Sequence, residues 1–166
     1  MDLIMTLILS VITMAGLFLM LWSGVAFIQD KRFFSSAHKD ILAIITPKQE
    51  RFKGQHILGY VLAFVAVAMN IGAIITGAVT GIHNGFGFWQ FFLRFGLMVI
   101  LLKLYDIIFF DWVLLCNSNF FPRYYPETRA VIGRHMFGYN KVSHLIHTIV
   151  YLAGAALLSL ICIHFV

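Results

Sequence analysis

Charged side chains are scarce in this chain of 166 residues. Asp, Glu, Lys and Arg make up 11% of it, whereas hydrophobic residues make up 61%. A typical soluble domain is about 25% charged and about 45–50% apolar. So few polar side chains cannot cover so many apolar ones in water. The composition therefore excludes an ordinary soluble domain and predicts an integral membrane protein.

Charge is also missing from long stretches of the chain. Residues 3–28 and 57–82 contain no Asp, Glu, Lys or Arg, and two further apolar runs cover residues 91–116 and 142–166. Each run exceeds the roughly 20 residues that a helix needs to cross the hydrocarbon. The runs are continuous, whereas the strands of a membrane barrel are short and alternate apolar with polar residues. We therefore predict an all-α, integral membrane four-helix bundle, with one transmembrane domain over residues 1–166.

Cysteine is rare too, which limits redox and metal chemistry. Cys116 and Cys162 are the two cysteines, and they fall at opposite predicted depths. A disulfide between them within one bundle is therefore excluded. The sequence also has no CxxC, metal-finger or haem-attachment motif.

The basic residues are concentrated in two predicted loops. Six of the twelve lie in residues 29–56 and four in residues 117–141, whereas residues 83–90 have none. Because basic loops stay on the cytoplasmic side, we predict a multi-pass protein of the cell (plasma) membrane with both termini outside the cytoplasm. The same charges predict contact with a lipid bilayer that carries anionic headgroups, and they require no nucleic-acid partner.

Three ionisable residues interrupt the apolar segment LLKLYDIIFFDW. Lys103, Asp106 and Asp111 lie within the third predicted span. A charge at the membrane centre costs about 2.5–3.5 kcal/mol on insertion scales, so such residues usually face protein or water and often mark function. At the α-helical step of 100° per residue they share one broad face. We expect Arg94, near the outer end of the same span, to reach the surface instead.

The fourth predicted span supplies possible partners for these charges. His144, His147 and Tyr151 are spaced i, i+3 and i+7, so they form one stripe. Antiparallel neighbours in sequence usually pack together. We therefore predict a ligand-binding or proton-relay site composed of Lys103, Asp106, Asp111, His144, His147 and Tyr151. The loop stiffened by Pro122 and Pro126 adds the candidates Asn117, Arg123 and Glu127.

Several functions suit these residue types. Transport or permeation of a proton, ion or small solute is favoured, because histidine and buried acids or lysines suit proton-coupled work. A membrane enzyme acting on a lipid or isoprenoid is an alternative. So is a structural ion pair between Lys103 and Asp106. A redox or metal protein is another alternative. One haem would be held by His56 with His144 or His147, and a second by His83 with His164. Without haem, a metal ion would be held by Asp111, His144 and His147.

Small residues form a stripe along residues 57–82. Its members are Ala66, Asn70, Ala73, Gly77 and Gly81, spaced by three or four. In lipid, small residues allow the close backbone approach that helix association needs. The stripe predicts helix packing within the bundle, and it also suits the interface of a homo-oligomer. Residues 35–45, before Pro47, predict a short interfacial helix.

The run DW…FFPRYYPET…H, from Asp111 onward, resembles small, uncharacterised bacterial four-span integral membrane proteins. The resemblance covers about the last third of the chain. It implies no activity and no residue role.

Overall fold

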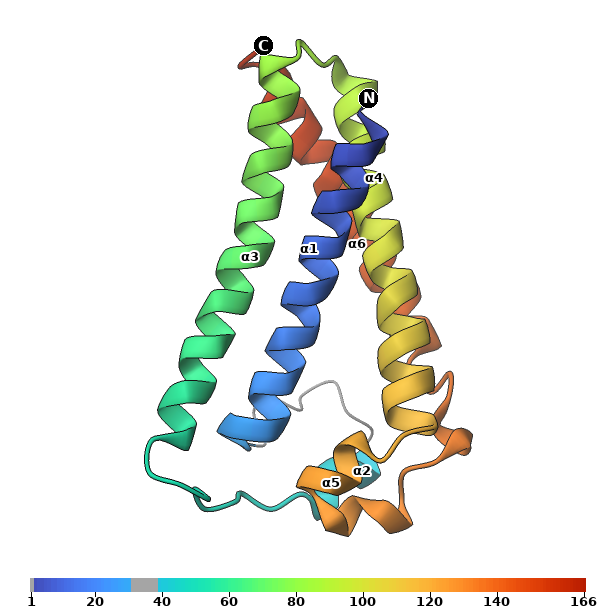
Figure 1. Ribbon diagram of the computed structural model, residues 1–166. Helices are drawn as coiled ribbons and strands as arrows, with labels where there is room; N and C mark the ends of the chain where they lie inside the picture. Colours follow the sequence, from blue (N-terminus) through green and yellow to red (C-terminus); the bar gives the residue numbers. More distant parts are fainter. Residues whose placement is uncertain (1, 31–38) are drawn as a thin grey trace. The chain divides into compact units, whose positions relative to one another are not determined.

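The computed structural model describes residues 2–30 and 39–166, which are mostly helical and contain no β-strand (Figure 1). The α-helices are α1 (Leu3–Trp22), α2 (Lys39–Ile44), α3 (Gln55–His83), α4 (Phe88–Tyr105), α5 (Phe120–Tyr124) and α6 (Lys141–Ile163). The π-helices are η1 (Ser23–Ile28) and η3 (Asp106–Cys116), and the 3-10 turns are η4 (Pro126–Ala130) and η5 (Arg134–Met136). Three runs, Leu3–Ile28, Gln55–His83 and Lys141–Ile163, are long and apolar enough to cross a membrane. The prediction of an all-α protein is therefore confirmed, and the three candidate spans support the membrane class. The fourth span and the four-helix bundle stay predictions.

The third apolar run is helical in two geometries. Helix α4 is followed directly by the π-helix η3, which begins at Asp106 and contains Asp111. A π-helix has i→i+5 hydrogen bonds, is rare, and is frequently found at functional sites. Two residues five apart point in more similar directions in a π-helix than in an α-helix. The angle between the directions of Asp106 and Asp111 is therefore smaller than the α-helical step of 100° per residue predicts.

The chain packs as two compact units drawn from separated segments. The first unit comprises Met1–Gly16, Ala68–Tyr105 and Lys141–Val166, and the second comprises Leu17–Val67 and Asp106–Asn140. Each unit has its own apolar core. Helices α1 and α3 contribute to both units, so neither unit is a continuous domain along the chain. One transmembrane domain over residues 1–166 stays a prediction.

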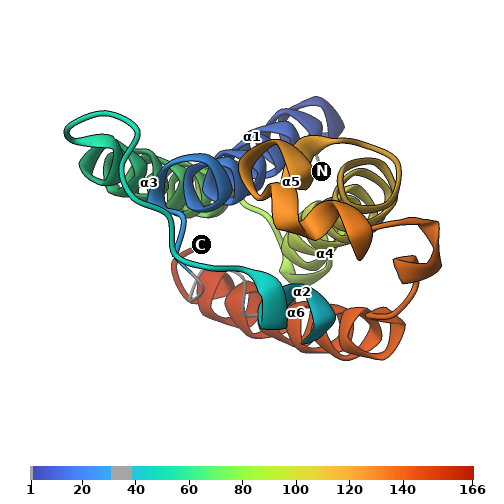
Figure 2. The same ribbon diagram turned by 90° about the horizontal axis from the view of Figure 1, so that it is seen from below.

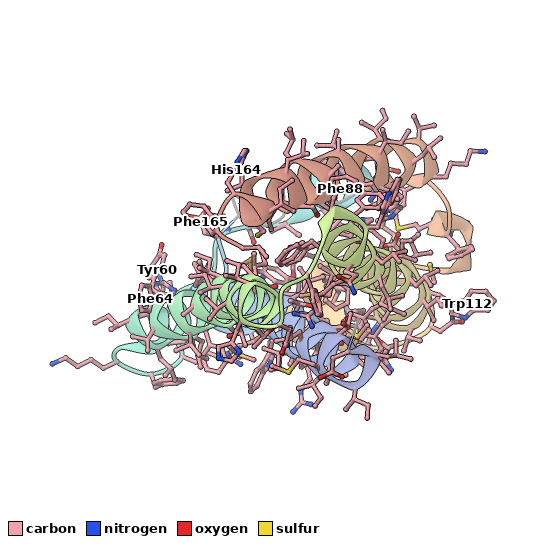
Figure 3. All side chains as sticks on the ribbon, turned by 90° about the horizontal axis from the view of Figure 1, so that it is seen from above. Tyr60, Phe64, Phe88, Trp112, His164 and Phe165 are labelled. Carbon is pink, nitrogen blue, oxygen red and sulfur yellow. The ribbon has the colours of Figure 1, made fainter. Side chains whose placement is uncertain are left out.

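The outward faces of the helices are apolar. In Figure 3, Tyr60 and Phe64 project away from α3, and Trp112 projects away from η3. Phe64 is 74% exposed and Ile4, on α1, is 73% exposed. A contiguous apolar exterior of this kind is rare on a monomeric soluble protein. It suits helices that are solvated by lipid.

Close packing in the first unit depends on the small residues of α3. A Cβ atom added to Gly81 would lie 2.3 Å from Cε1 of Phe91, and one added to Gly77 would lie 3.2 Å from Cε1 of Phe95. Ala66 and Ala73 of the same stripe are also buried. The stripe therefore packs within the chain, as predicted. Its use in a homo-oligomer stays a prediction.

Buried hydroxyl groups form a second stripe, which the sequence analysis did not identify. On α1, Thr6 donates to the carbonyl oxygen of Asp2, Ser10 to that of Thr6 and Thr13 to that of Ser10, each at 2.8 Å. Each hydroxyl is thus satisfied by its own helix. Small polar residues can therefore face the bundle interior without needing water.

Arg94 does not reach the surface, so that prediction is wrong. Its side chain is 0% exposed, and Nη1 donates to the carbonyl oxygen of Gly77 at 2.7 Å and to Oγ1 of Thr80 at 2.8 Å. The guanidinium carbon lies 4.5 Å from the ring centroid of Phe86. Lipid offers no hydrogen bonds, whereas α3 offers a carbonyl and a hydroxyl one turn apart. The inward position therefore gives Nη1 two partners, while Nε and Nη2 stay buried without a partner among the described residues.

The second unit is organised around Gln55 at the start of α3. Its buried Nε2 donates to the carbonyl oxygen of Phe27 at 2.8 Å and to Oε1 of Gln29 at 3.1 Å, and its Oε1 accepts from Nε of Arg51 at 3.0 Å. Gln29 has φ +54° and its backbone N–H donates to the carbonyl oxygen of Gly24, which ends η1. One amide side chain thus joins the end of η1 to the start of α3.

Short helices complete the second unit (Figure 2). Helix α2 confirms the later part of the helix predicted before Pro47, and residues 35–38 lie outside the described residues. Helix α5 contains Pro122 and ends before Pro126, where η4 begins. Pro126 therefore separates α5 from η4, whereas Pro122 lies in the first turn of α5, where a missing N–H is tolerated.

Replacing Gly81 by alanine tests the close approach of α3 and α4. We expect G81A to lower the free energy of unfolding by about 1–3 kcal/mol, because the ring of Phe91 must move. Thermal unfolding of the purified protein in one detergent measures the effect. In the control variant G72A the new Cβ meets no described atom within 4 Å, so this variant should not lose stability.

The contact between Arg94 and Thr80 can be measured with a double-mutant cycle. We expect R94A and T80V to be coupled by about 1 kcal/mol, because each variant removes the same charge-assisted hydrogen bond. Unfolding of the native protein, both single variants and the double variant gives this value. A cycle of R94A with T148V should be additive, since Thr148 donates to the carbonyl oxygen of His144 on α6. Equal coupling in both cycles would contradict the contact.

Candidate functional site

The first unit brings together two of the predicted site residues. Lys103, on α4, is 8% exposed, and its Nζ lies 3.0 Å from Nδ1 of His144, in the first turn of α6. One nitrogen of such a contact must donate and the other must accept. The contact therefore links α4 to α6 by one hydrogen bond between Lys103 and His144.

The contact sets the register of these two helices. Lys103 lies opposite His144, and eight residues further along α6 Leu152 lies opposite Gly96, where a Cβ atom would be 3.7 Å from Cδ2 of Leu152. Lys103 is thus level with the first turn of α6. The predicted approach of Asp111 to His144 and His147 joins residues of different units and stays a prediction.

His147 and Tyr151 lie on an exposed flank of α6. Their rings stack with centroids 5.9 Å apart and planes 12° apart, and Nδ1 of His147 is 3.4 Å from Oγ of Ser143. Histidine, tyrosine and serine therefore make a polar strip on α6 beside the contact of His144 with Lys103. The predicted stripe of His144, His147 and Tyr151 is present, but its members do not all face α4.

A cavity of about 490 Å³ lies in the first unit beside these residues. Helices α4 and α6 supply most of its wall, and α3 and α1 complete it. Its lining residues are Thr13, Asn70, Ile74, Phe95, Met98, Val99, Leu102, Val150, Tyr151, Gly154, Ala155 and Leu158. The wall is apolar except for a few groups, and this volume is typical of small-molecule sites. Except for Tyr151, the lining was not predicted, because most of its residues read as ordinary membrane-helix residues.

The acidic residues of the predicted site lie in the second unit, on η3. Burial, together with the nearby carboxylates of Asp111 and Asp106, raises the pKa of Tyr139 to about 12. Both carboxylates are therefore close enough to act on the same phenol. Tyr139 is a residue that the sequence analysis missed, because it lies in the polar loop before α6.

The loop candidates have different surroundings. Oε1 of Glu127 is 2.7 Å from Nζ of Lys48 and accepts from Oγ1 of Thr46 at 3.5 Å. Burial alone would raise the pKa of Glu127, but the hydrogen bond and charge of Lys48 outweigh it and hold this pKa below its ordinary value. Nδ2 of Asn117 donates to the carbonyl oxygen of Trp112 at 2.8 Å, whereas Arg123 is exposed.

Two hollows, each of about 340 Å³, lie beside Asn117 in the second unit. The first is lined by Trp112, Cys116, Asn117 and Phe137. The second is lined by Cys116, Asn117, Ser118, Asn119, Pro122, Arg129 and Ile132. They share Cys116 and Asn117, so an apolar hollow adjoins a polar one.

The predicted metal and haem sites receive no support. Within residues 2–30 and 39–166, no three His, Cys, Asp or Glu side chains lie close enough together to hold a metal ion. Both cysteines are free and buried. The paired histidines proposed for haem stay a prediction.

Comparisons with protein-family models, with curated proteins and with solved structures found no match. The arrangement of these residues is therefore the basis for a functional assignment.

Proposed function

We propose that this chain is a four-span protein of the cell membrane that moves a proton or a small solute through its first unit. The observation that carries the proposal is the contact of 3.0 Å between Lys103 and His144 beside the cavity of about 490 Å³. The cavity would hold the solute, and the two bases would take up and release a proton.

The fourth span of this proposal is the run formed by α4 and η3, Phe88–Cys116. Its two basic residues, Arg94 and Lys103, are both buried rather than turned toward lipid. Charges in membrane helices are tolerated when they face protein or water in this way. With four spans, the two basic loops lie on one side, which places both termini outside the cytoplasm.

The position of the two bases suits a relay at one end of the cavity. The α4 residues that line the cavity end at Leu102, next to Lys103, and those of α6 begin at Val150, beyond His144. Lys103 and His144 therefore lie on the side of the cavity nearer the predicted cytoplasmic loops. A hydrogen-bonded pair of bases there would pass a proton from one to the other as the cavity fills or empties.

Replacing Lys103 by methionine tests the proposal directly. In liposomes that contain the purified protein, a pH-sensitive dye reports proton flux and a panel of labelled small solutes reports their uptake. We expect K103M to lower the flux by about tenfold or more, equivalent to about 1.4 kcal/mol or more. The control K141M removes an exposed lysine of the same unit and should leave flux unchanged.

A glutamine at His144 separates a relay from a structural contact. H144Q keeps a hydrogen-bond acceptor for Lys103 but cannot carry the proton. We expect it to unfold at nearly the native temperature while losing flux and its pH dependence. Native liposomes that carry neither protons nor any tested solute would overturn the transport proposal.

A second candidate is a membrane enzyme that acts on a lipid or isoprenoid. The apolar wall of the cavity favours it, since an acyl or prenyl chain needs such a wall. Gly154 lines the cavity and has room for a side chain, so G154F should fill it, whereas G72F adds bulk outside the cavity. Mass spectrometry of extracted lipids would show a converted or retained species that G154F removes and G72F does not.

A further inference from the structure

The apolar hollow of the second unit is formed by two exposed aromatic rings. Trp112 is 53% exposed and Phe137 is 46% exposed, with ring centroids 5.1 Å apart and planes at 67°. Two rings at this angle form a corner rather than the parallel plates that clamp a flat base. A corner of this kind suits a flexible hydrocarbon chain, and Trp is enriched where membrane helices meet the headgroups.

The polar hollow offers hydrogen-bond donors beside this corner. Asn119 precedes α5 without using its side chain as a cap, and Arg129 is exposed. Ser118 and Asn117 also line the hollow, and their side chains donate to the carbonyl oxygens of Leu114 and Trp112. Those two side chains are therefore engaged, while the amide of Asn119 and the guanidinium of Arg129 are available to a ligand.

Arg129 is the charged side chain among the residues that line the polar hollow. The acidic side chain nearest in sequence to Arg129 is Glu127, and its carboxylate is held by Lys48 at 2.7 Å. Glu127 is therefore compensated elsewhere and does not neutralise Arg129. Residues 117–140 contain three arginines and this single acidic residue. Arginine binds phosphate oxygens with paired, charge-assisted hydrogen bonds.

We infer that the adjoining hollows bind one anionic phospholipid, with its phosphate at Arg129 and Asn119 and its hydrocarbon chain against Trp112 and Phe137. The shared wall of Cys116 and Asn117 makes the two hollows a single amphipathic surface. The inference concerns the second unit and does not depend on transport through the first.

Native mass spectrometry of the full chain tests this inference. The purified protein is mixed with equal amounts of phosphatidylglycerol and phosphatidylcholine in detergent, and the retained lipids are counted. We expect the native chain to retain phosphatidylglycerol preferentially. R129Q should reduce that preference about tenfold, the effect of losing a charge-assisted hydrogen bond of about 1.4 kcal/mol. N119A should reduce it less.

Variants of the apolar hollow should change lipid retention in a different way. W112A should weaken retention of both lipids equally, because it removes hydrocarbon contact and no charge. W89A is the matched control, since Trp89 is 70% exposed in the first unit, outside both hollows. Unfolding temperatures near the native value show that the variants are folded. N119A, which removes only an exposed amide, still tests the phosphate contact if R129Q fails to fold.

R123Q tests whether the preference for anionic lipid comes from Arg129 in particular or from exposed arginines in general. Arg123 is an exposed arginine on α5 that lines neither hollow, so R123Q should keep the native preference. Equal losses in R123Q and R129Q would overturn the inference, because they would show a general attraction of basic residues to acidic lipid. Displacement of the lipid by millimolar inorganic phosphate would also overturn it, because the hollow would then bind free phosphate rather than a lipid.

Discussion

Polar groups inside a helical bundle that is surrounded by lipid must find their partners within the chain, because hydrocarbon donates and accepts no hydrogen bonds. This constraint governs the first unit. Thr6, Ser10 and Thr13 bond the carbonyl oxygens of their own helix, and Ser159 bonds that of Ala155. Such residues can then line the interior of the bundle, where a larger polar side chain would need a partner on another helix.

Arg94 and Lys103 meet part of the same constraint through neighbouring helices, although Nε and Nη2 of Arg94 are buried without a hydrogen-bond partner among the described residues. Arg94 is held by a carbonyl and a hydroxyl of α3, and Lys103 lies against His144 of α6. Each therefore links α4 to another helix. The close approach of Gly77 and Gly81 to α4 makes the first link short enough. Small residues and buried charges thus act together, because a charge can reach its partner only where the backbones come close.

The second unit differs from the first, because its sequence carries nine of the twelve basic residues of the chain. Gln55 joins η1 to α3 by hydrogen bonds, and Lys48 joins the segment before α3 to η4 through Glu127. Tyr139 lies near the carboxylates of Asp106 and Asp111. The π-helical form of η3 brings these two acids toward one face. The ionisable groups of this unit therefore lie on or beside a few short elements, although they are spread along the sequence.

Composition and hydrophobic run length by themselves determined the helical membrane class, the helical runs and the packing stripe on α3. These properties depend on the solvent and on the helical repeat, both of which are local. They also identified Lys103 and His144 as candidates. Only the tertiary structure decided that these two residues meet, that Arg94 turns inward, and that a cavity and two hollows lie beside the predicted residues. Those outcomes depend on the register between helices and on the position of a carbonyl or hydroxyl group on a neighbouring helix. Neither can be derived from the sequence of a single helix.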